Sequence, residues 1–250
     1  MELNKIYNEN CLDTMKRMPD NFIDLTVTSP PYDNLRKYNG FSFDFESVAK
    51  ELFRVTKQGG VVVWVVGDAT IEGSETGTSF KQALFFMECG FNLHDTMIYE
   101  KNSTAYPARS NGNRYSQIFE YMFVFSIDTP KAANLIIDKS NKWAGHKDFS
   151  GKLKNPVPNF SPRNNILKYT TSFNDETGHP AAFPEQLAKD HIYSWSNKGD
   201  LVYDCFGGSG TTAKMAHLQK RNWILSEISQ EYCDIAQKRI QPYLNQTTLF

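Results

Sequence analysis

A hydroxyl, two prolines and an aromatic ring follow one another at Ser29, Pro30, Pro31 and Tyr32, directly after the strand-like run 25–27. Prolines cannot continue a hydrogen-bonded ladder, so they fix an extended exit from a strand. Such an exit would present the Ser29 hydroxyl, the Pro30 carbonyl and the Tyr32 ring where parallel-sheet ligands bind. Two acceptors and a ring suit a planar base with an exocyclic amine. A plain turn with Tyr32 in the core fits the same spacing.

A glycine-rich turn, DCFGGSGTTA at 204–213, separates a strand pattern from a helix pattern. Its glycines allow a ligand to approach the backbone closely, and the N-terminus of the following helix favours an anionic group. Asp204 and Glu227, each at the end of a strand pattern, could accept hydrogen bonds from ribose hydroxyls, which indicates a nucleoside cofactor. Gly208, Gly210 and Ala213 also satisfy the dinucleotide fingerprint GxGxxG/A, and an ordinary strand-to-helix turn is a further alternative.

The elements that must position these residues alternate between strand and helix at both ends of the chain. Alternation of this kind, with a continuous apolar run at 61–66, predicts a doubly wound, mostly parallel α/β sheet covered on both faces. The predicted strands are 5–11, 22–29, 61–68, 200–206 and 223–228, and the predicted helices are 12–20, 45–60, 78–90, 184–196, 210–222 and 229–244. We expect a single domain over 1–250, with an irregular insertion at 102–178 and a cofactor-binding half at 179–250.

Charge is unevenly distributed along the chain. The formal net charge is −1, yet residues 101–168 hold 11 Lys and Arg against 4 Asp and Glu. A basic block on an otherwise acidic protein favours docking of a polyanion there, although a solvated loop surface fits as well. The residues that we expect to contact such a polyanion in this block are Arg109, Arg114, Lys142, Lys147, Lys152, Lys154 and Arg163.

Composition excludes several other classes of protein. No window approaches the roughly 18 apolar residues of a membrane span, and the polar N-terminus is no signal peptide. The four cysteines are scattered, without the spacing of a zinc site or a disulfide framework. We therefore expect a cytoplasmic protein with reduced thiols and no metal.

With TSPPY first, a basic region next and the glycine loop near the C-terminus, the sequence resembles the S-adenosylmethionine-dependent DNA amino-methyltransferases of the beta group. Residues 8–32 and 178–192 match further segments of that family. The resemblance implies the circularly permuted methyltransferase fold, S-adenosylmethionine as cofactor, double-stranded DNA as substrate, a possible homodimer and a place in a restriction–modification system.

The same resemblance assigns roles to individual residues. Ser29, Pro30, Pro31 and Tyr32 correspond to the catalytic tetrapeptide, and Glu227 to the acidic residue that binds ribose. Asn10, beside Cys11, stands where the family usually has an acidic residue near the adenine. The residues matched to the methionine end of the cofactor are His179, Pro180, Phe183, Pro184, Asp204, Phe206, Gly207, Gly208, Ser209, Gly210 and Thr211.

These roles predict transfer of a methyl group to the amine of a base flipped out of the duplex. Serine before the two prolines favours cytosine N4, with adenine N6 as the alternative, and no cysteine follows the prolines to attack a cytosine ring. A nicotinamide-dependent oxidoreductase, a methyltransferase for RNA or a protein amide, and a catalytically silent DNA-binding module are the other interpretations left open.

Overall fold

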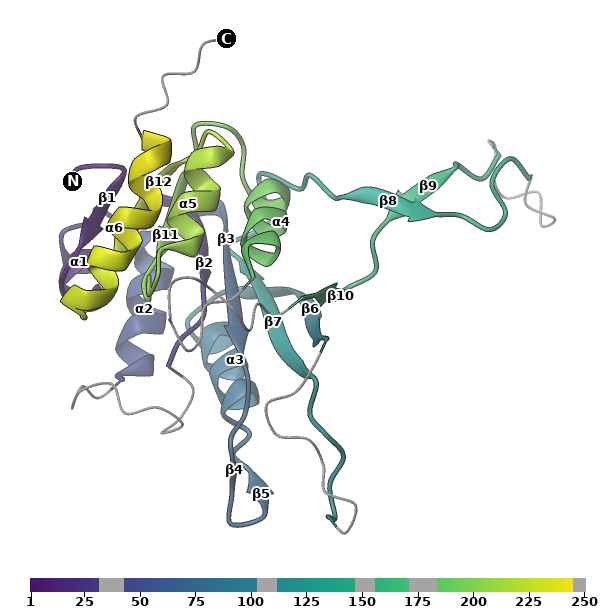
Figure 1. The fold of residues 1–250 in the computed structure, drawn as a ribbon, viewed down its shortest axis with the longest axis horizontal. Helices are drawn as coiled ribbons and strands as arrows, with labels where there is room; N and C mark the ends of the chain where they lie inside the picture. The colour runs from purple at the N-terminus through teal and green to yellow at the C-terminus, as the bar shows by residue number, and fades with distance from the viewer. Residues whose placement is uncertain (32–42, 103–111, 147–155, 171–183, 245–250) are drawn as a thin grey trace.

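The computed structural model describes residues 1–31, 43–102, 112–146, 156–170 and 184–244. Its centre is an eight-stranded sheet in which β7 runs antiparallel to both of its neighbours and all other pairs are parallel (Figure 1). The sheet confirms the predicted doubly wound, mostly parallel fold. In spatial order its strands are β1 (Lys5–Tyr7), β12 (Asn222–Ser226), β11 (Leu201–Asp204), β2 (Ile23–Thr28), β3 (Thr56–Val66), β7 (Phe119–Ser126), β6 (Asn92–Lys101) and β10 (Ile166–Tyr169).

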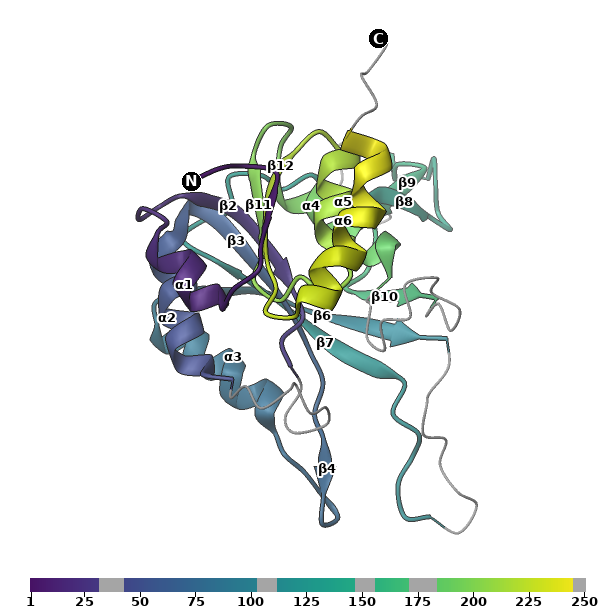
Figure 2. The same cartoon turned by 60° about the vertical axis from the view of Figure 1, so that its left-hand side comes forward.

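Helices cover both faces of the sheet (Figure 2). One face carries α1 (Cys11–Lys16), α2 (Phe45–Val55) and α3 (Thr78–Glu88), and the other carries α4 (Glu185–Trp195), α5 (Thr211–Leu218) and α6 (Gln230–Leu244). Successive residues of β3 therefore enter opposite cores, Trp64 on the first face and Val63 on the second. Coverage on both sides explains why β3 is a continuous apolar run rather than an alternating one.

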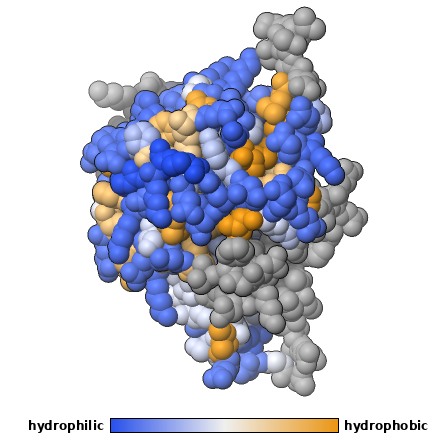
Figure 3. Space-filling model, turned by 90° about the vertical axis from the view of Figure 1, so that its left-hand side faces the viewer, coloured by the Kyte–Doolittle hydropathy of each residue, from blue (hydrophilic) through white to orange (hydrophobic). Residues whose placement is uncertain are grey.

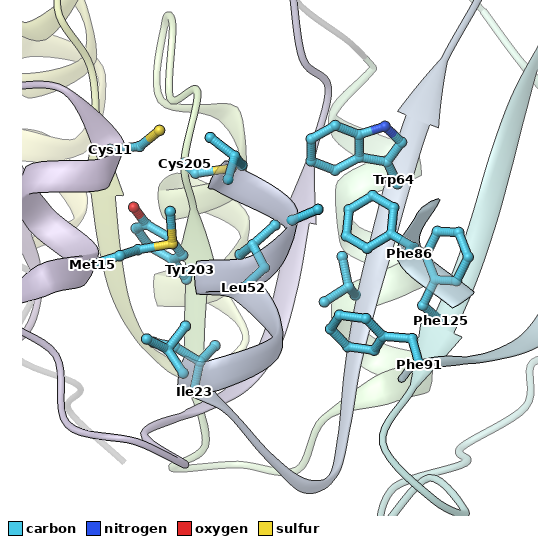
Figure 4. Close-up of a cluster of buried hydrophobic side chains, with 14 of the residues drawn as sticks. Cys11, Met15, Ile23, Leu52, Trp64, Phe86, Phe91, Phe125, Tyr203 and Cys205 are labelled. Carbon is cyan, nitrogen blue, oxygen red and sulfur yellow. The ribbon is translucent and has the colours of Figure 1, made fainter. Parts of the chain in front are cut away.

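The first core is rich in aromatic rings. Trp64, Phe86 and Phe125 are fully buried in it, and the rings of Phe86 and Phe125 stack with their centroids 4.6 Å apart (Figure 4). Towards α1 the same cluster contains Cys11 and Cys205. The outer surface over α1 and α6 is mostly hydrophilic, with scattered apolar patches (Figure 3).

The chain changes face between β11 and β2, which lie side by side in the sheet. After β11 the chain passes through α5 on one face, whereas after β2 it passes through α2 on the other face. Connections that leave in opposite directions open a crevice at the carboxyl ends of the two strands, where open α/β sheets bind ligands.

The predicted helix at 45–60 is too long. Helix α2 ends at Val55, and Thr56 is already extended and paired with Ile23 of β2. Gly59 and Gly60 lie inside β3, beside a register shift in that ladder, and a Cβ on Gly60 would come within 2.7 Å of the Thr56 side chain. The two glycines therefore form an irregularity in a strand, and not the helix stop that their position suggested.

The region 102–178 is not one insertion. Its residues 119–126 form β7, between β3 and β6, and residues 166–169 form the edge strand β10. A two-stranded arm of β8 (Ile137–Ser140) and β9 (Phe160–Pro162) projects from the sheet (Figure 1). Outside this region, β4 (Thr70–Ile71) and β5 (Ser74–Glu75) form a smaller hairpin. No helix among the described residues is long and apolar enough to cross a membrane.

Candidate active site

Two sequence motifs nearly two hundred residues apart meet at the crevice. Val202 and Tyr203 of β11 pair in register with Leu25 and Thr26 of β2. Just beyond this pairing, the Thr28 hydroxyl donates a 2.6 Å hydrogen bond to the carboxylate of Asp204, and both side chains are buried. The backbone segments that begin the two motifs therefore lie at one edge of the sheet.

The tetrapeptide leaves the sheet directly after this bond. Ser29 is half-buried, Pro30 is buried and Pro31 is half-buried, at the carboxyl end of β2. Tyr32, His179 and Phe183, which the sequence also assigns to the site, lie outside the described residues.

Glycine is required in the turn after β11 for two separate reasons. A Cβ on Gly207 would lie 2.0 Å from the Leu225 side chain, which is far inside contact distance. Gly208 and Gly210 have φ of 48° and 80°, in the left-handed region that other residues rarely adopt. Gly210 is also the N-cap of α5, so the turn delivers the chain directly into a helix N-terminus.

Two carboxylates, the buried Asp204 and the half-buried Glu227, hold this turn. Asp204 accepts from the Phe206 N–H at 3.1 Å as well as from Thr28, and Glu227 accepts from the N–H groups of Gly208 and Ser229, each at 2.8 Å. Burial raises the pKa of Asp204 to about 6, against the opposing effect of its hydrogen bonds, and burial also raises the pKa of Glu227. Both predicted cofactor ligands thus support the loop backbone themselves.

Arg239 of α6 contacts the loop from behind, and no motif indicated it. Its guanidinium donates to the Ser209 carbonyl at 3.3 Å, to the Ser209 hydroxyl at 3.0 Å and to the Thr211 hydroxyl at 3.0 Å. The sequence predicts that Ser209 and Thr211 contact the cofactor, but their side chains are engaged by this arginine. Each hydroxyl accepts from the guanidinium and keeps its own proton to donate, so their contact with the cofactor stays a prediction.

Asn10 and Cys11 stand at the start of α1. The Asn10 side chain accepts from the Leu12 N–H at 2.9 Å and so caps the helix, a local role that its residue type favours. Cys11 is buried, and burial raises the pKa of its thiol to about 12. A thiol in this state is a poor nucleophile.

Three of the seven basic residues predicted to meet DNA are described. Lys142 is exposed on the arm beside Trp143, whose side chain is 66% exposed. Arg114 contacts the Gly73 carbonyl and lies near Glu75, on the smaller hairpin. Arg109, Lys147, Lys152 and Lys154 lie outside the described residues.

Arg163, the third, has two carboxylate partners in the described structure. Its guanidinium pairs with Asp138 at 2.6 Å and with the buried Asp190 of α4 at 2.7 Å. The hydrogen bonds that it donates to Asp138 are the largest cause of its raised pKa. Because two carboxylates occupy the guanidinium, this residue joins the base of the arm to α4 in the described structure.

Comparison with known proteins gives consistent similarities. A family model described as DNA methylase, for N6 and N4 enzymes, matches residues 23–238. The orphan methyltransferase M.BamHII of Bacillus amyloliquefaciens is 56% identical over 241 residues, covering 89% of this chain and 90% of that protein. The type II methyltransferase M.BglII of Bacillus subtilis is 27% identical, covering 94% of this chain and 68% of that protein.

Solved structures share the fold. The PvuII DNA methyltransferase, named cytosine-N4-specific, superposes with a TM-score of 0.72 at 23% identity, covering 96% of this chain and 91% of that one. TTHA0409 of Thermus thermophilus, described as a putative DNA modification methylase and solved in complex with S-adenosyl-L-methionine, superposes with a TM-score of 0.67 at 21% identity, covering 96% of each chain.

Proposed function

This chain belongs to the DNA methylase family, and we propose that it transfers the methyl group of S-adenosylmethionine to cytosine N4 of a base flipped out of double-stranded DNA. The observation that carries the proposal is the meeting of β2 and β11. The hydrogen bond from Thr28 to Asp204 holds the start of the tetrapeptide against the start of the glycine loop. A methyl donor in the loop would thus lie beside the acceptors of Ser29 and Pro30.

The loop has the features that an adenosylated cofactor requires. Its backbone is free of side chains at Gly207, Gly208 and Gly210, and it ends at the N-terminus of α5, where the amino acid carboxylate of a ligand is favoured. Glu227, at the end of β12, lies within reach of the same loop and is the proposed ribose acceptor. When bound, S-adenosylmethionine supplies an electrophilic methyl group on a sulfonium.

The chain's own residues would act by positioning. The Ser29 hydroxyl and the Pro30 carbonyl accept hydrogen bonds from the exocyclic amine and turn its lone pair towards the methyl group. Tyr32, by its place in the tetrapeptide, stacks on the extruded base, a contact worth roughly 1–3 kcal/mol in comparable sites. The thiols of Cys11 and Cys205 take no covalent part, because burial raises the pKa of both.

Cytosine N4 is favoured over adenine N6 by two observations. Serine precedes the prolines in this chain, and the PvuII enzyme that shares its fold is named cytosine-N4-specific. Mass spectrometry of nucleosides from DNA incubated with the protein and S-adenosylmethionine tests the choice. We expect N4-methylcytosine, and N6-methyladenine alone would overturn it. S-adenosylmethionine should raise the melting temperature, whereas NAD should not.

DNA is proposed to lie along the arm and the basic residues of 101–168. Lys142 and Trp143 are exposed there, and the Arg114 side chain contacts the smaller hairpin. Arg109, Lys147, Lys152 and Lys154 complete the proposed set from the sequence alone. Affinity for DNA should fall steeply with added salt if these residues meet phosphates.

A homodimer is also proposed, through the outer face of α3. Phe80, Leu84 and Met87 are each exposed by 45% or more, at the spacing of one helix face. Lys81 and Glu88 are exposed near the two ends of the helix, so two antiparallel copies of α3 would set unlike charges opposite each other. Sedimentation should show a dimer that Leu84→Asp dissociates, and a wild-type monomer at micromolar concentration would overturn the proposal.

A further inference from the structure

A group of charged side chains lies behind the glycine loop and joins three helices. One guanidinium nitrogen of Arg239, on α6, donates hydrogen bonds to the hydroxyls of Ser209 and Thr211 in the loop. The other donates to the Glu185 carboxylate of α4 at 2.5 Å. Glu185 also accepts from Lys214 of α5 at 2.7 Å. The Arg239 side chain is 15% exposed and that of Lys214 is 14% exposed, so the two cations are largely shielded from water, whereas the Glu185 side chain is 41% exposed.

In this group the Glu185 carboxylate lies between two cationic partners, Lys214 and Arg239. Burial alone would raise the pKa of Glu185, yet the hydrogen bonds from Lys214 and Arg239 hold it below its usual value. The carboxylate therefore stays ionised between two cations. An arginine suits the central position because its planar fork can serve the loop and the carboxylate at once, whereas a lysine offers one point charge.

Arg239 meets the loop at two buried hydroxyls. Ser209 and Thr211 are each 3% exposed, and their hydroxyls both accept from the same guanidinium nitrogen. Gly210 packs against α6 so closely that a Cβ there would meet Ala236 at 2.8 Å. Loss of the guanidinium would leave the buried hydroxyl oxygens of Ser209 and Thr211 without this donor, and the cost in free energy favours a displaced loop.

Glu185 also adjoins the second segment of the chain that the sequence assigns to the cofactor site. It is the first residue of α4 and directly follows Pro184, the last residue of the segment 179–184 matched to the methionine end. Arg239 thus connects the glycine loop on one side of the expected methionine site to the start of α4 on the other.

We propose that Arg239 is a positioning residue for methyl transfer: it holds the glycine loop against α4 and thereby sets the affinity for S-adenosylmethionine without touching the DNA. The proposal rests on the proposed function. Removal of Arg239 should weaken cofactor binding and leave DNA binding and the rate at saturating cofactor close to those of the wild type.

Titration calorimetry and steady-state kinetics on Arg239→Met, Arg239→Lys and the wild type test this role. We expect Kd and KM for S-adenosylmethionine to rise about tenfold in Arg239→Met, with kcat within about threefold, because supporting hydrogen bonds to charged groups act on this scale. Arg239→Lys should fall in between, since its ammonium reaches either the loop or Glu185. Lys238→Met, an exposed neighbour on α6, removes the same charge and should bind as the wild type does.

The outcomes separate this proposal from the proposed function. A wild-type protein that does not bind S-adenosylmethionine contradicts the proposed function. A wild type that binds, together with an Arg239→Met variant of unchanged Kd, contradicts the positioning role. A lower melting temperature and active fraction with unchanged Kd would show a merely structural residue. If Arg239→Met does not fold, Arg239→Lys and Glu185→Gln decide: an unchanged Kd in both overturns the proposal.

Discussion

The two ends of this molecule are built by different means. At the crevice between β2 and β11, buried side chains from distant parts of the sequence bond directly to each other, as Thr28 does to Asp204. The arm of β8 and β9 is held by backbone hydrogen bonds within the arm itself, such as those between Gly145 and Val157 and between Asn141 and Asn159. Its ion pair from Arg163 to Asp190 is a contact back to α4.

The difference shows where each kind of task can be carried out. Methyl transfer needs reacting groups held to within a fraction of an ångström, and a crevice inside a two-sided sheet supplies that rigidity. An exposed arm can change its side chains without disturbing the core, so a recognition sequence can vary there. Trp143 and Ile137 are both more than 60% exposed, which no position in the crevice could tolerate.

The largest contrast between the regions is expected from adding one methyl group to a glycine in each. Gly207→Ala should destabilise the protein by about 3 kcal/mol or more, because its Cβ would overlap the Leu225 side chain. Gly145→Ala, in the arm, has open space around the new Cβ and only its φ of +79° to oppose it, so we expect about 1 kcal/mol. Thermal unfolding measures both, and equal effects would contradict the contrast.

Removal of the Ser29 hydroxyl should affect chemistry alone. We expect Ser29→Ala to lower kcat by about 100-fold, the scale of losing one preorganised polar contact to a reacting group. Affinity for DNA and for S-adenosylmethionine should stay within about threefold, as calorimetry can show. Trp143→Ala is the matched change in the arm, and there we expect weaker DNA binding with kcat retained. A Ser29→Ala enzyme with full kcat would remove this serine from the mechanism.

The ionisation of Asp204 gives the crevice a pH dependence. Its pKa in the folded protein, about 6, lies above the ordinary value of 3.8. The folded state therefore keeps a proton that the unfolded state has lost, so stability is highest at low pH and falls as pH rises through 6. We expect the free energy of unfolding to drop by about 1–2 kcal/mol between pH 5 and pH 8 from this group.

Asp204→Asn isolates that contribution. The amide keeps an acceptor for Thr28 and does not ionise, so the variant should gain stability relative to the wild type as pH rises from 5 to 8. Denaturant unfolding at several pH values gives the difference. A constant difference across this range would mean that Asp204 does not titrate there.

The sequence was sufficient to predict the crevice because its information is local. Ser29 and the prolines end a strand, and Gly207 to Gly210 form a turn; that the two meet was implied by the family resemblance, and the pairing of β2 with β11 shows it. Arg239 could not be predicted, since it lies about thirty residues from its loop partners on an amphipathic helix and its pairing depends on how α6 packs. Strand β7 was missed inside the basic block, although its apolar run FEYMFVF was visible.

Two further features depend on packing that the sequence does not show. Gly59 and Gly60 suggest a helix stop because glycine permits both a helix end and an irregular strand, and only the pairing of β2 with β3 distinguishes them. Arg163 was counted with the phosphate contacts because charge along the chain does not show which basic side chains already face carboxylates. Arg163 pairs with the buried Asp190 on α4, and no local sequence pattern indicates this contact.

The smallest expected effect comes from a single exposed charge on the arm. Lys142→Ala should weaken DNA binding only a few-fold at moderate salt and should reduce the slope of log K against log salt by about one, as loss of one phosphate contact predicts. Lys16→Ala removes an equal charge from α1, on the opposite side of the molecule from the arm (Figure 1), and should leave the slope unchanged. Fluorescence anisotropy at several salt concentrations measures both slopes. Equal slopes for the two variants would mean that DNA does not follow the arm, and that the basic block reflects a solvated surface rather than a docking site.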